Sequence, residues 1–235
     1  MRLVDQSYEI LTPIKSKYDR FRIYEDIVDA GRTCYKSKAP NDEPEPGIDY
    51  EGFGEWLEER LNKDEVFLSK RIAEGHESML EQVDIRVRII TNRAIANELV
   101  RHRLASYMQE STRYCNYSQE KFGSEITFVY SSYFQIGTSG FDAFVKSCED
   151  AEKTYFELLN IGYSPEQARD VLPLSVKTEL IMKANLREWR HILKLRAAET
   201  TGRVHPMMKQ LMKPLLMDFK TALPVIFDDI GKEGV

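Results

Sequence analysis

The chain has 235 residues, which is enough for one large domain with a sizeable core or for two small ones. Hydrophobic residues make up 42% and charged residues 30%, the balance of a globular rather than a disordered protein. The net charge of -5 argues against a dedicated duplex-binding protein, because such proteins are usually basic. Local basic clusters would still suit a small anionic substrate.

The cysteine pattern and the opening residues bear on location. The chain has three cysteines, Cys34, Cys115 and Cys148. An odd number at wide spacing does not indicate a set of disulfide bonds. The first residues lack the apolar stretch of a signal peptide, and no segment approaches the length of a membrane span. We therefore expect a cytoplasmic protein with reduced thiols and no membrane partner.

The first third of the chain predicts one strand and several helices. Residues 3–11 favour a strand, and Tyr24–Tyr35 favours a helix. Residues 39–52 are rich in proline, glycine and acid, which is typical of an exposed, mobile loop. Helical spacing then predicts a helix from Phe53 to Leu61 and a second from Val66 to Ala73.

The middle of the chain contains the clearest strand. Apolar and charged residues alternate from Val83 to Ile89, the pattern of a half-buried strand. A helix is predicted near 92–103, then a polar loop, then a strand over Glu125–Tyr130. An apolar stripe from Phe141 to Leu159 predicts a long helix that Gly162 ends.

The last third predicts three helices and a strand. Ser164, Pro165 and Gln167 form the start of a helix, with Gln167 completing a capping box. Residues 174–182 favour a strand over a helix, and helices follow near 186–198 and 207–223. Together these elements predict one α+β domain over residues 1–235, with a small, mostly antiparallel sheet packed against several helices.

A dense basic segment, RHRLASYMQESTRY, begins at Arg101. Such a run is most often a solvated helix end. On a helix, Arg101 and Arg103 would diverge by about 200°, so they would hold two ligands rather than one anion. Arginine forms paired, charge-assisted hydrogen bonds with phosphate, and Ser111, Thr112 and Arg113 could complete a phosphate cradle.

The pattern Arg-His-Arg, seven residues, then Ser resembles the signature of flavin-dependent thymidylate synthases. Three further elements resemble motifs of that family in the same order, namely Gly75–Ser78, Arg169–Pro173, and Asn185–Arg187 with His191 and Leu195–Ala197. One such motif could arise by chance, but four in order are hard to attribute to chance.

The resemblance implies reductive methylation of dUMP to dTMP, with methylenetetrahydrofolate as carbon donor, FAD as hydride carrier and NADPH as reductant. It also implies an oligomer, a homotetramer with active sites between subunits. By position, the flavin would contact Ser78, Arg101, His102, Arg103, Gln109, Asn185, Arg187 and His191. The nucleotide would contact Glu98, Arg101, Gln109, Glu110, Ser111, Thr112, Arg113, Arg169 and Arg196. Arg196 would be catalytic, facing the uracil and favouring its ionised ring.

Several positions depart from the family pattern. Met108 and Gln109 stand where Asn and then Glu are usual, Thr112 where Gly is common, and Glu98 where Gln is common. Histidine is frequent at the positions of Gln82 and Thr200. Met108 cannot replace the hydrogen bonds of an amide, so the sequence does not fix the exact substrate. The alternative is a flavin-dependent hydroxymethylation of a pyrimidine nucleotide.

The helix predicted near 186–198 has one basic face. Arg187, Arg190, His191 and Lys194 fall within an arc of about 100°, while Arg196 lies near the opposite side. This arrangement fits a polyanionic cofactor on one side and a second ligand on the other. The simpler reading of the basic face is solvent exposure.

Other assignments are weaker. Ser111 has no base near it in sequence to make it a nucleophile, and Cys115 is more simply a packed thiol. His76 and Glu77 lack partners at metal-ligand spacing, so we expect no metal. The apolar residues between Met207 and Leu216 predict core or a subunit interface. A non-catalytic nucleotide- or RNA-binding module, or a degenerate homologue kept for assembly, remains an alternative, although the acidic net charge disfavours nucleic acid.

Overall fold

The structure is a computed structural model that describes residues 1–37 and 43–231. It divides the chain into two compact units, each built from two separate stretches of sequence. Unit 1 comprises residues 1–9 and 87–182, and unit 2 comprises residues 10–86 and those from 183 onward. The residues of the family motifs are divided between the two units. Those in 101–113 and 169–173 belong to unit 1, and those in 75–78 and 185–197 belong to unit 2.

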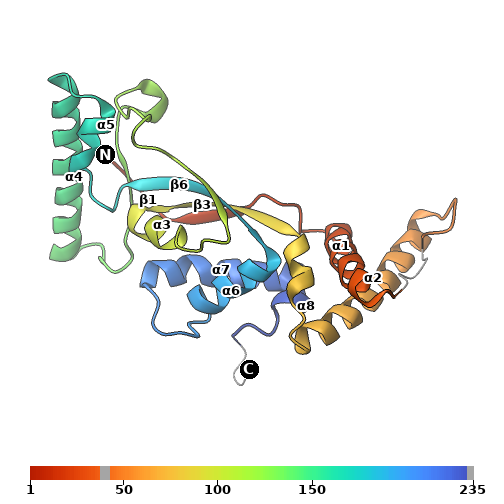
Figure 1. Ribbon diagram of the computed structural model, residues 1–235. Helices are drawn as coiled ribbons and strands as arrows, with labels where there is room; N and C mark the ends of the chain where they lie inside the picture. The colour runs from red at the N-terminus through yellow and green to blue at the C-terminus, as the bar shows by residue number, and fades with distance from the viewer. Residues whose placement is uncertain (38–42, 232–235) are drawn as a thin grey trace. The chain divides into compact units, whose positions relative to one another are not determined.

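Unit 1 joins a small sheet region to a long helix. Its elements are β1 (Arg2–Val4), α3 (Arg93–Leu99), β4 (Ser106–Gln109), η2 (Glu120–Phe122), β5 (Thr127–Val129), α4 (Ser139–Asn160), α5 (Pro165–Ala168) and η3 (Arg169–Val171). β1 pairs in parallel with β5. The short elements α5 and η3 pack against α4 (Figure 1).

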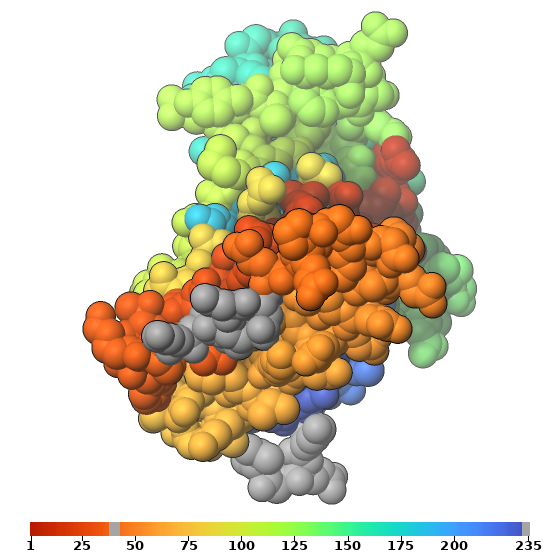
Figure 2. Space-filling view, turned by 90° about the vertical axis from the view of Figure 1, so that its right-hand side faces the viewer, coloured from red at the N-terminus to blue at the C-terminus, as the bar shows by residue number. Residues whose placement is uncertain are grey.

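Unit 2 is mainly helical. Its elements are α1 (Lys17–Tyr35), α2 (Tyr50–Ala73), η1 (Ser78–Gln82), α6 (Leu186–Arg196), α7 (Pro206–Ala222) and α8 (Pro224–Phe227). α1 packs against α2 and η1, and α6 packs against α7 and η1. Figure 2 shows the side of this unit on which α2, in orange, presents its outer face.

Three strands run across the boundary between the units: β2 (Ser7–Ile10), β3 (Asp84–Asn92) and β6 (Lys177–Asn185). With β4 they form a four-stranded sheet in the order β2-β3-β6-β4. Asp84 of β3 pairs with Lys183 of β6 at 2.6 Å, and Arg88 pairs with Glu179 at 3.1 Å. Going from Asp84 to Arg88 along β3, the paired residue on β6 moves back from Lys183 to Glu179, so the two strands run antiparallel. The α+β class and the small antiparallel sheet are confirmed.

Most predicted elements are confirmed, and their caps explain their bounds. The strands at 83–89 and 174–182 are β3 and β6, and the predicted helices at 141–159, 186–198 and 207–223 are α4, α6 and α7. α4 ends before Gly162, which has a φ of 102° that suits glycine. The backbone N–H of Ser164 donates to Oε1 of Gln167 at 3.0 Å, the reciprocal half of a capping box.

Four predicted boundaries are wrong. The strand predicted over 3–11 is broken into β1 and β2. α1 begins at Lys17, seven residues before Tyr24, because Ser16 and Asp19 form a capping box there. α2 is a single helix that starts at Tyr50, inside the predicted loop 39–52; residues 38–42 of that loop lie outside the described residues.

The fourth error concerns the segment after β3. The helix predicted near 92–103 ends at Leu99, and the polar loop after it contains β4. Arg101, His102 and Arg103 therefore lie in turns rather than on a helix. The estimate that Arg101 and Arg103 diverge by about 200° does not apply to this backbone.

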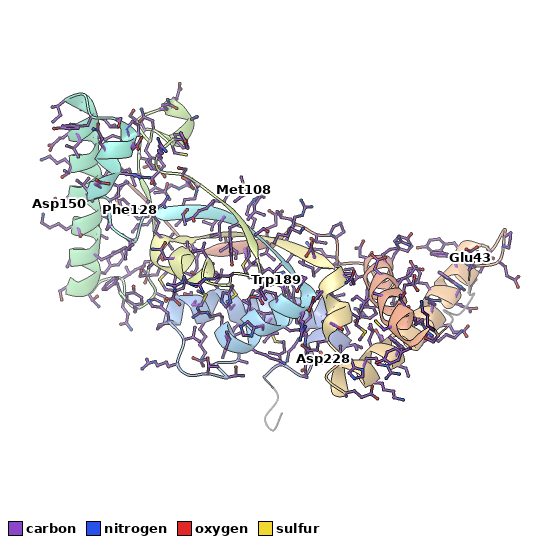
Figure 3. All side chains as sticks on the ribbon, in the orientation of Figure 1. Glu43, Met108, Phe128, Asp150, Trp189 and Asp228 are labelled. Carbon is purple, nitrogen blue, oxygen red and sulfur yellow. The ribbon has the colours of Figure 1, made fainter. Side chains whose placement is uncertain are left out.

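Each unit has its own core. In unit 1, Phe128 and Tyr155 are fully buried in a cluster with Cys148. In unit 2, the ring of Trp189 packs edge-on against Phe219 at 5.4 Å, and its Nε1–H donates to the carbonyl of Ile85 at 3.0 Å. Trp189 is labelled in Figure 3. The apolar residues of α7 are buried as predicted: Met207, Met208, Leu211, Met212, Leu215 and Leu216.

Candidate functional site

The loop from Ser111 to Arg113 follows β4 in unit 1 and is tightly turned. The carbonyl of Ser111 accepts hydrogen bonds from the N–H groups of Tyr114 at 3.2 Å and Cys115 at 2.9 Å. The hydroxyl of Ser111 accepts from the N–H of Arg113 at 3.3 Å. These bonds fix the backbone on both sides of Thr112, whose side chain is buried.

Arg169 reaches this loop from a distant part of the sequence. It begins η3, and its Nη1 donates to Oγ1 of Thr112 at 3.5 Å. Arg113 is half-exposed, and its Nε pairs with Glu166 of α5 at 3.1 Å. Two guanidinium groups and two hydroxyls thus lie on and around one turn, a donor set suited to a phosphate.

The Arg-His-Arg segment has one buried and two exposed side chains. His102 is 7% exposed, whereas Arg101 and Arg103 are exposed. The hydroxyl of Tyr107 donates to the carbonyls of Leu99 and His102 at 2.7 and 2.9 Å. These bonds hold the turn, so that two arginines are presented to solvent from a fixed backbone.

The departures from the family pattern have distinct environments. Met108 on β4 is 77% exposed (Figure 3). The Gln109 side chain donates from Nε2 to the hydroxyl of Thr178 at 3.1 Å, and Thr178 is fully buried. Glu98 is half-buried on α3. Gln109 is therefore held in a fixed orientation, whereas Met108 has no such hydrogen bond within residues 1–37 and 43–231.

Unit 2 contains a cavity of about 340 Å³ around the second family motif. Among the residues that line it are Ser78 and Arg187, two of the predicted flavin contacts. Arg187 is half-exposed and its Nη1 pairs with Glu81 of η1 at 2.5 Å. Residues from α1, α2, η1 and α6 thus meet around one space.

Arg71 and Tyr35 are among the lining residues of this cavity that were not predicted from the sequence. The guanidinium of Arg71 stacks over the ring of Tyr35 at 4.5 Å. The ring of Tyr35 stacks in turn on His76, and its hydroxyl lies 2.5 Å from Nδ1 of that histidine. Neither residue belongs to a recognisable motif, so sequence reasoning had no signal for them.

The chemistry of this cavity fits a flavin nucleotide. Arg71 lines the wall, and its buried Nε has no hydrogen-bond partner among the described residues. Arg187 supplies a second guanidinium, and the Tyr35–His76 stack supplies flat ring surfaces. Cationic donors suit the phosphates and flat rings suit the planar part of such a group.

The remaining predicted residues of unit 2 lie along α6. Asn185 caps the helix, and its Oδ1 accepts from the N–H of Glu188 at 2.9 Å. His191 is exposed, and Arg196, the last residue of α6, is half-buried. Asn185 therefore has its amide N–H₂ group available for a ligand, since its oxygen serves the cap.

The uniform basic face predicted for this helix is wrong at Arg190. Its side chain is 2% exposed and pairs with Glu77 at 2.9 Å and with Asp229 at 2.6 Å. It also donates to the carbonyl of Ile226. Arg190 thus points inward and links Glu77, just before η1, to Asp229, just after α8. Lys194 stays half-exposed at 4.0 Å from Glu77.

This buried pair predicts an acid-sensitive contribution to stability. Burial of Asp229 disfavours its charge, but the hydrogen bond and the positive charge of Arg190 outweigh burial and lower the pKa of Asp229. A carboxyl with a lowered folded pKa stabilises the fold above its unfolded pKa, and the contribution is lost as pH falls through the folded pKa. We expect the free energy of unfolding to fall below about pH 4. The free energy of unfolding, measured by urea titration at a series of pH values, should fall less steeply at acid pH in Asp229→Asn than in the wild type. The same fall in both proteins would contradict the assignment.

Within 1–37 and 43–231, no group of three or more His, Cys, Asp or Glu side chains is placed to hold a metal ion. Over the same part of the chain, no helix is both long enough and apolar enough to cross a membrane.

Comparison with known proteins places these features in a family. The family model described as thymidylate synthase complementing protein matches residues 22–225. A flavin-dependent thymidylate synthase of Geobacter sulfurreducens is 33% identical over 205 residues, covering 86% of this chain and 79% of that protein. One from Pyrococcus furiosus is 35% identical over 153 residues, covering 63% of this chain and 62% of that protein.

A solved structure has a similar fold. It is the crystal structure of a UMP/dUMP methylase, PolB, from Streptomyces cacaoi, bound with 5-Br dUMP. The TM-score is 0.71 at 18% identity, and the match covers 97% of this chain and 96% of that one. At this identity the likeness concerns the fold alone.

Proposed function

Because the chain belongs to the thymidylate synthase complementing protein family, we propose that it is a flavin-dependent thymidylate synthase that methylates dUMP to dTMP. The observation that carries the proposal is the meeting of Arg169 with the Ser111–Arg113 loop at 3.5 Å in unit 1. Arg169, from one family motif, thus contacts Thr112, 57 positions earlier in another, and their donor groups suit a phosphate.

The nucleotide contacts in this proposal come from the side chains around that turn. The hydroxyls of Ser111 and Thr112 donate to the phosphate, and Arg113 and Arg169 neutralise its charge. Gln109, held by Thr178, orients the base or sugar. Arg101 provides a further cation, and Glu98 on α3 completes the proposed nucleotide contacts. Arg196 faces the uracil and favours its ionised ring.

The cofactor is FAD. When bound, it supplies the hydride that completes the methyl group, with NADPH as reductant and methylenetetrahydrofolate as carbon donor. Arg187, Ser78 and the N–H₂ group of Asn185 hold the flavin nucleotide at the unit 2 cavity. His191, Arg101, His102, Arg103 and Gln109 complete the flavin contacts. The cavity's arginines, rather than its carboxylates, suit the phosphates.

The proposal extends to assembly and location. The enzyme is a cytoplasmic homotetramer with active sites at subunit interfaces, and its partners are small molecules rather than nucleic acid or membrane. Residues 1–235 form one functional domain, a view supported by a family match that runs through both compact units.

A second candidate activity is flavin-dependent hydroxymethylation of a pyrimidine nucleotide. It is favoured by Met108, which is exposed where the family usually has an amide. Loss of that amide's hydrogen bonds would alter how the base or water is held. Mass analysis of the product separates the two reactions, because a hydroxymethyl product is heavier by one oxygen.

The activity is tested on purified protein. We expect a yellow sample with the absorption of FAD, and dTMP formation when dUMP, NADPH and methylenetetrahydrofolate are supplied together. Omitting each co-substrate in turn serves as the control. A flavin-containing sample that forms no dTMP with every co-substrate present would reject the activity and favour a degenerate homologue.

Arg187→Ala is expected to weaken the binding of FAD. The guanidinium is half-exposed and lines the cavity, so its loss removes a charge-assisted contact without opening the core. Such a contact contributes about 1.5–3 kcal/mol, so FAD affinity should fall roughly tenfold or more. Fluorescence titration of the apoprotein with FAD measures the change, with Arg203→Ala, an exposed arginine outside the cavity, as the matched control. Unchanged affinity would place the cofactor elsewhere.

A further inference from the structure

Glu110 has all of its polar atoms engaged within unit 1. Its N–H donates to the carbonyl of Glu179 at 2.8 Å, and its own carbonyl accepts from Arg93 at 3.1 Å. Oε1 accepts from the hydroxyl of Tyr117 at 2.9 Å, and Oε2 accepts from Nζ of Lys177 at 2.8 Å. The side chain is 14% exposed. Both carboxylate oxygens are therefore oriented by bonds within the protein, at the edge of a cavity of about 420 Å³ that Gln109 and Lys177 also line.

The bond to Tyr117 closes a loop. Glu110 stands directly before the Ser111–Arg113 turn, and Tyr117 comes four residues after it. Their side chains therefore join the two ends of the segment 111–116 at 2.9 Å. Because Tyr117 also packs against Tyr155 at 6.0 Å in the unit 1 core, the loop is attached to the core at its second end.

The contacts of Glu110 with Tyr117 and Lys177 form a brace, and the charges in it favour a persistent contact. Burial and the negative charge of Glu110 raise the pKa of Tyr117, so its hydroxyl keeps the proton that it donates. The ammonium of Lys177 is 24% exposed and balances the carboxylate. Removing one member leaves a mostly buried charge or acceptor without its partner, which is costly in a protein interior.

We propose that Glu110 is a positioning residue that acts through Tyr117 and Lys177 to hold the Ser111–Arg113 turn in its nucleotide-binding shape, without touching the nucleotide itself. The proposal rests on the nucleotide site argued above. It refines the role that the family resemblance implies for Glu110, because Tyr117 and Lys177 orient the two carboxylate oxygens and connect them to the far end of the loop and to β6.

The first test follows the loop without any nucleotide. Hydrogen exchange at the N–H groups of Tyr114 and Cys115 reports the turn, because both donate to the carbonyl of Ser111. Tyr117→Phe removes one hydroxyl and should raise exchange there by roughly tenfold, while Tyr163→Phe, at an exposed tyrosine of the same unit, should leave it unchanged. Unchanged exchange in Tyr117→Phe would overturn the brace.

The second test separates positioning from contact. In a mutant cycle on dUMP affinity, Glu110→Gln alone should weaken binding by roughly tenfold, and it should add little in a background of Tyr117→Phe with Lys177→Met. Effects that multiply would mean that Glu110 touches the nucleotide, which would overturn the proposal. Glu120→Gln, at an exposed acid near the loop, is the control and should leave binding unchanged.

A failure of this proposal and a failure of the proposed function would give different experimental results. A wild-type protein that binds no dUMP would reject the nucleotide site, while the hydrogen-exchange result would still decide whether the brace orders the loop. If Glu110→Gln fails to fold, as judged by circular dichroism, the cycle is run between Tyr117→Phe and Lys177→Met. Because both act on one carboxylate, their effects on dUMP affinity should not multiply, and multiplying effects would again overturn the proposal.

Discussion

Replacing Arg190 by Ala is expected to lower the free energy of unfolding by about 3–5 kcal/mol, the usual cost of breaking a buried ion pair by removing one partner. The side chain is 2% exposed and bonds to both Glu77 and Asp229, so its loss leaves two carboxylates without their main partner. In a protein of this size the melting temperature should fall by about 10 °C. Thermal unfolding followed by circular dichroism measures this.

Two further variants separate charge from packing. Lys194→Ala removes a half-exposed lysine of the same helix, 4.0 Å from Glu77, and should change stability by less than about 1 kcal/mol. Arg190→Met with Glu77→Gln and Asp229→Asn removes all three charges and keeps most of the volume. It should recover part of the lost stability, because well-packed neutral groups often replace a buried ion network without loss. No recovery would mean that the cost comes from lost packing and hydrogen bonds rather than from unbalanced charge.

The Arg190 network also bears on the cavity of unit 2. Glu77 lines that cavity next to Ser78, and Arg190 holds its Oε1 through two nitrogens at 3.1 and 2.9 Å. Freed from Arg190, this carboxylate would leave an unbalanced negative charge on a wall proposed to face phosphates. FAD affinity should therefore fall in Arg190→Ala even at temperatures where the protein stays folded.

Elements with regular apolar spacing could be predicted from the sequence, and those with buried charges could not. β3 alternates cleanly from Val83 to Ile89, and its buried face is as expected. In α2 the apolar stripe is interrupted because Arg60 and Asp64 occupy buried positions, 5% and 0% exposed, and pair with each other at 3.3 Å. A periodicity count treats both as surface residues, so one helix was predicted as two.

The site was predicted where a motif is local and missed where partners are remote. Ser111 to Arg113 lie in one recognisable segment, and Arg169 belongs to a second one. Arg190 looks like a surface residue on a helical wheel, because Asp229, its partner, lies 39 residues away and carries no motif. The fold decides such pairings through long-range packing, which the spacing within one helix cannot reveal.

Replacing Arg196 by Ala is expected to abolish dTMP formation while FAD stays bound. Arg196 follows Arg187 by nine positions on α6, so the two guanidinium groups leave the helix on roughly opposite sides. If the flavin is held on the Arg187 side, removal of Arg196 leaves that contact intact. The proposed role on the uracil is electrostatic: the cation favours the ionised ring, so the reaction loses its activated substrate.

Three measurements test this assignment. The visible spectrum should retain bound FAD in Arg196→Ala, dUMP affinity should weaken roughly tenfold or more, and dTMP should fall below detection. Arg196→Lys keeps a positive charge but loses the planar fork, so it should retain part of the activity if charge is what matters. Arg203→Ala, an exposed arginine after α6, should behave as wild type. Full activity in Arg196→Ala would remove this residue from the uracil site, whereas loss of flavin together with activity would assign it to the cofactor.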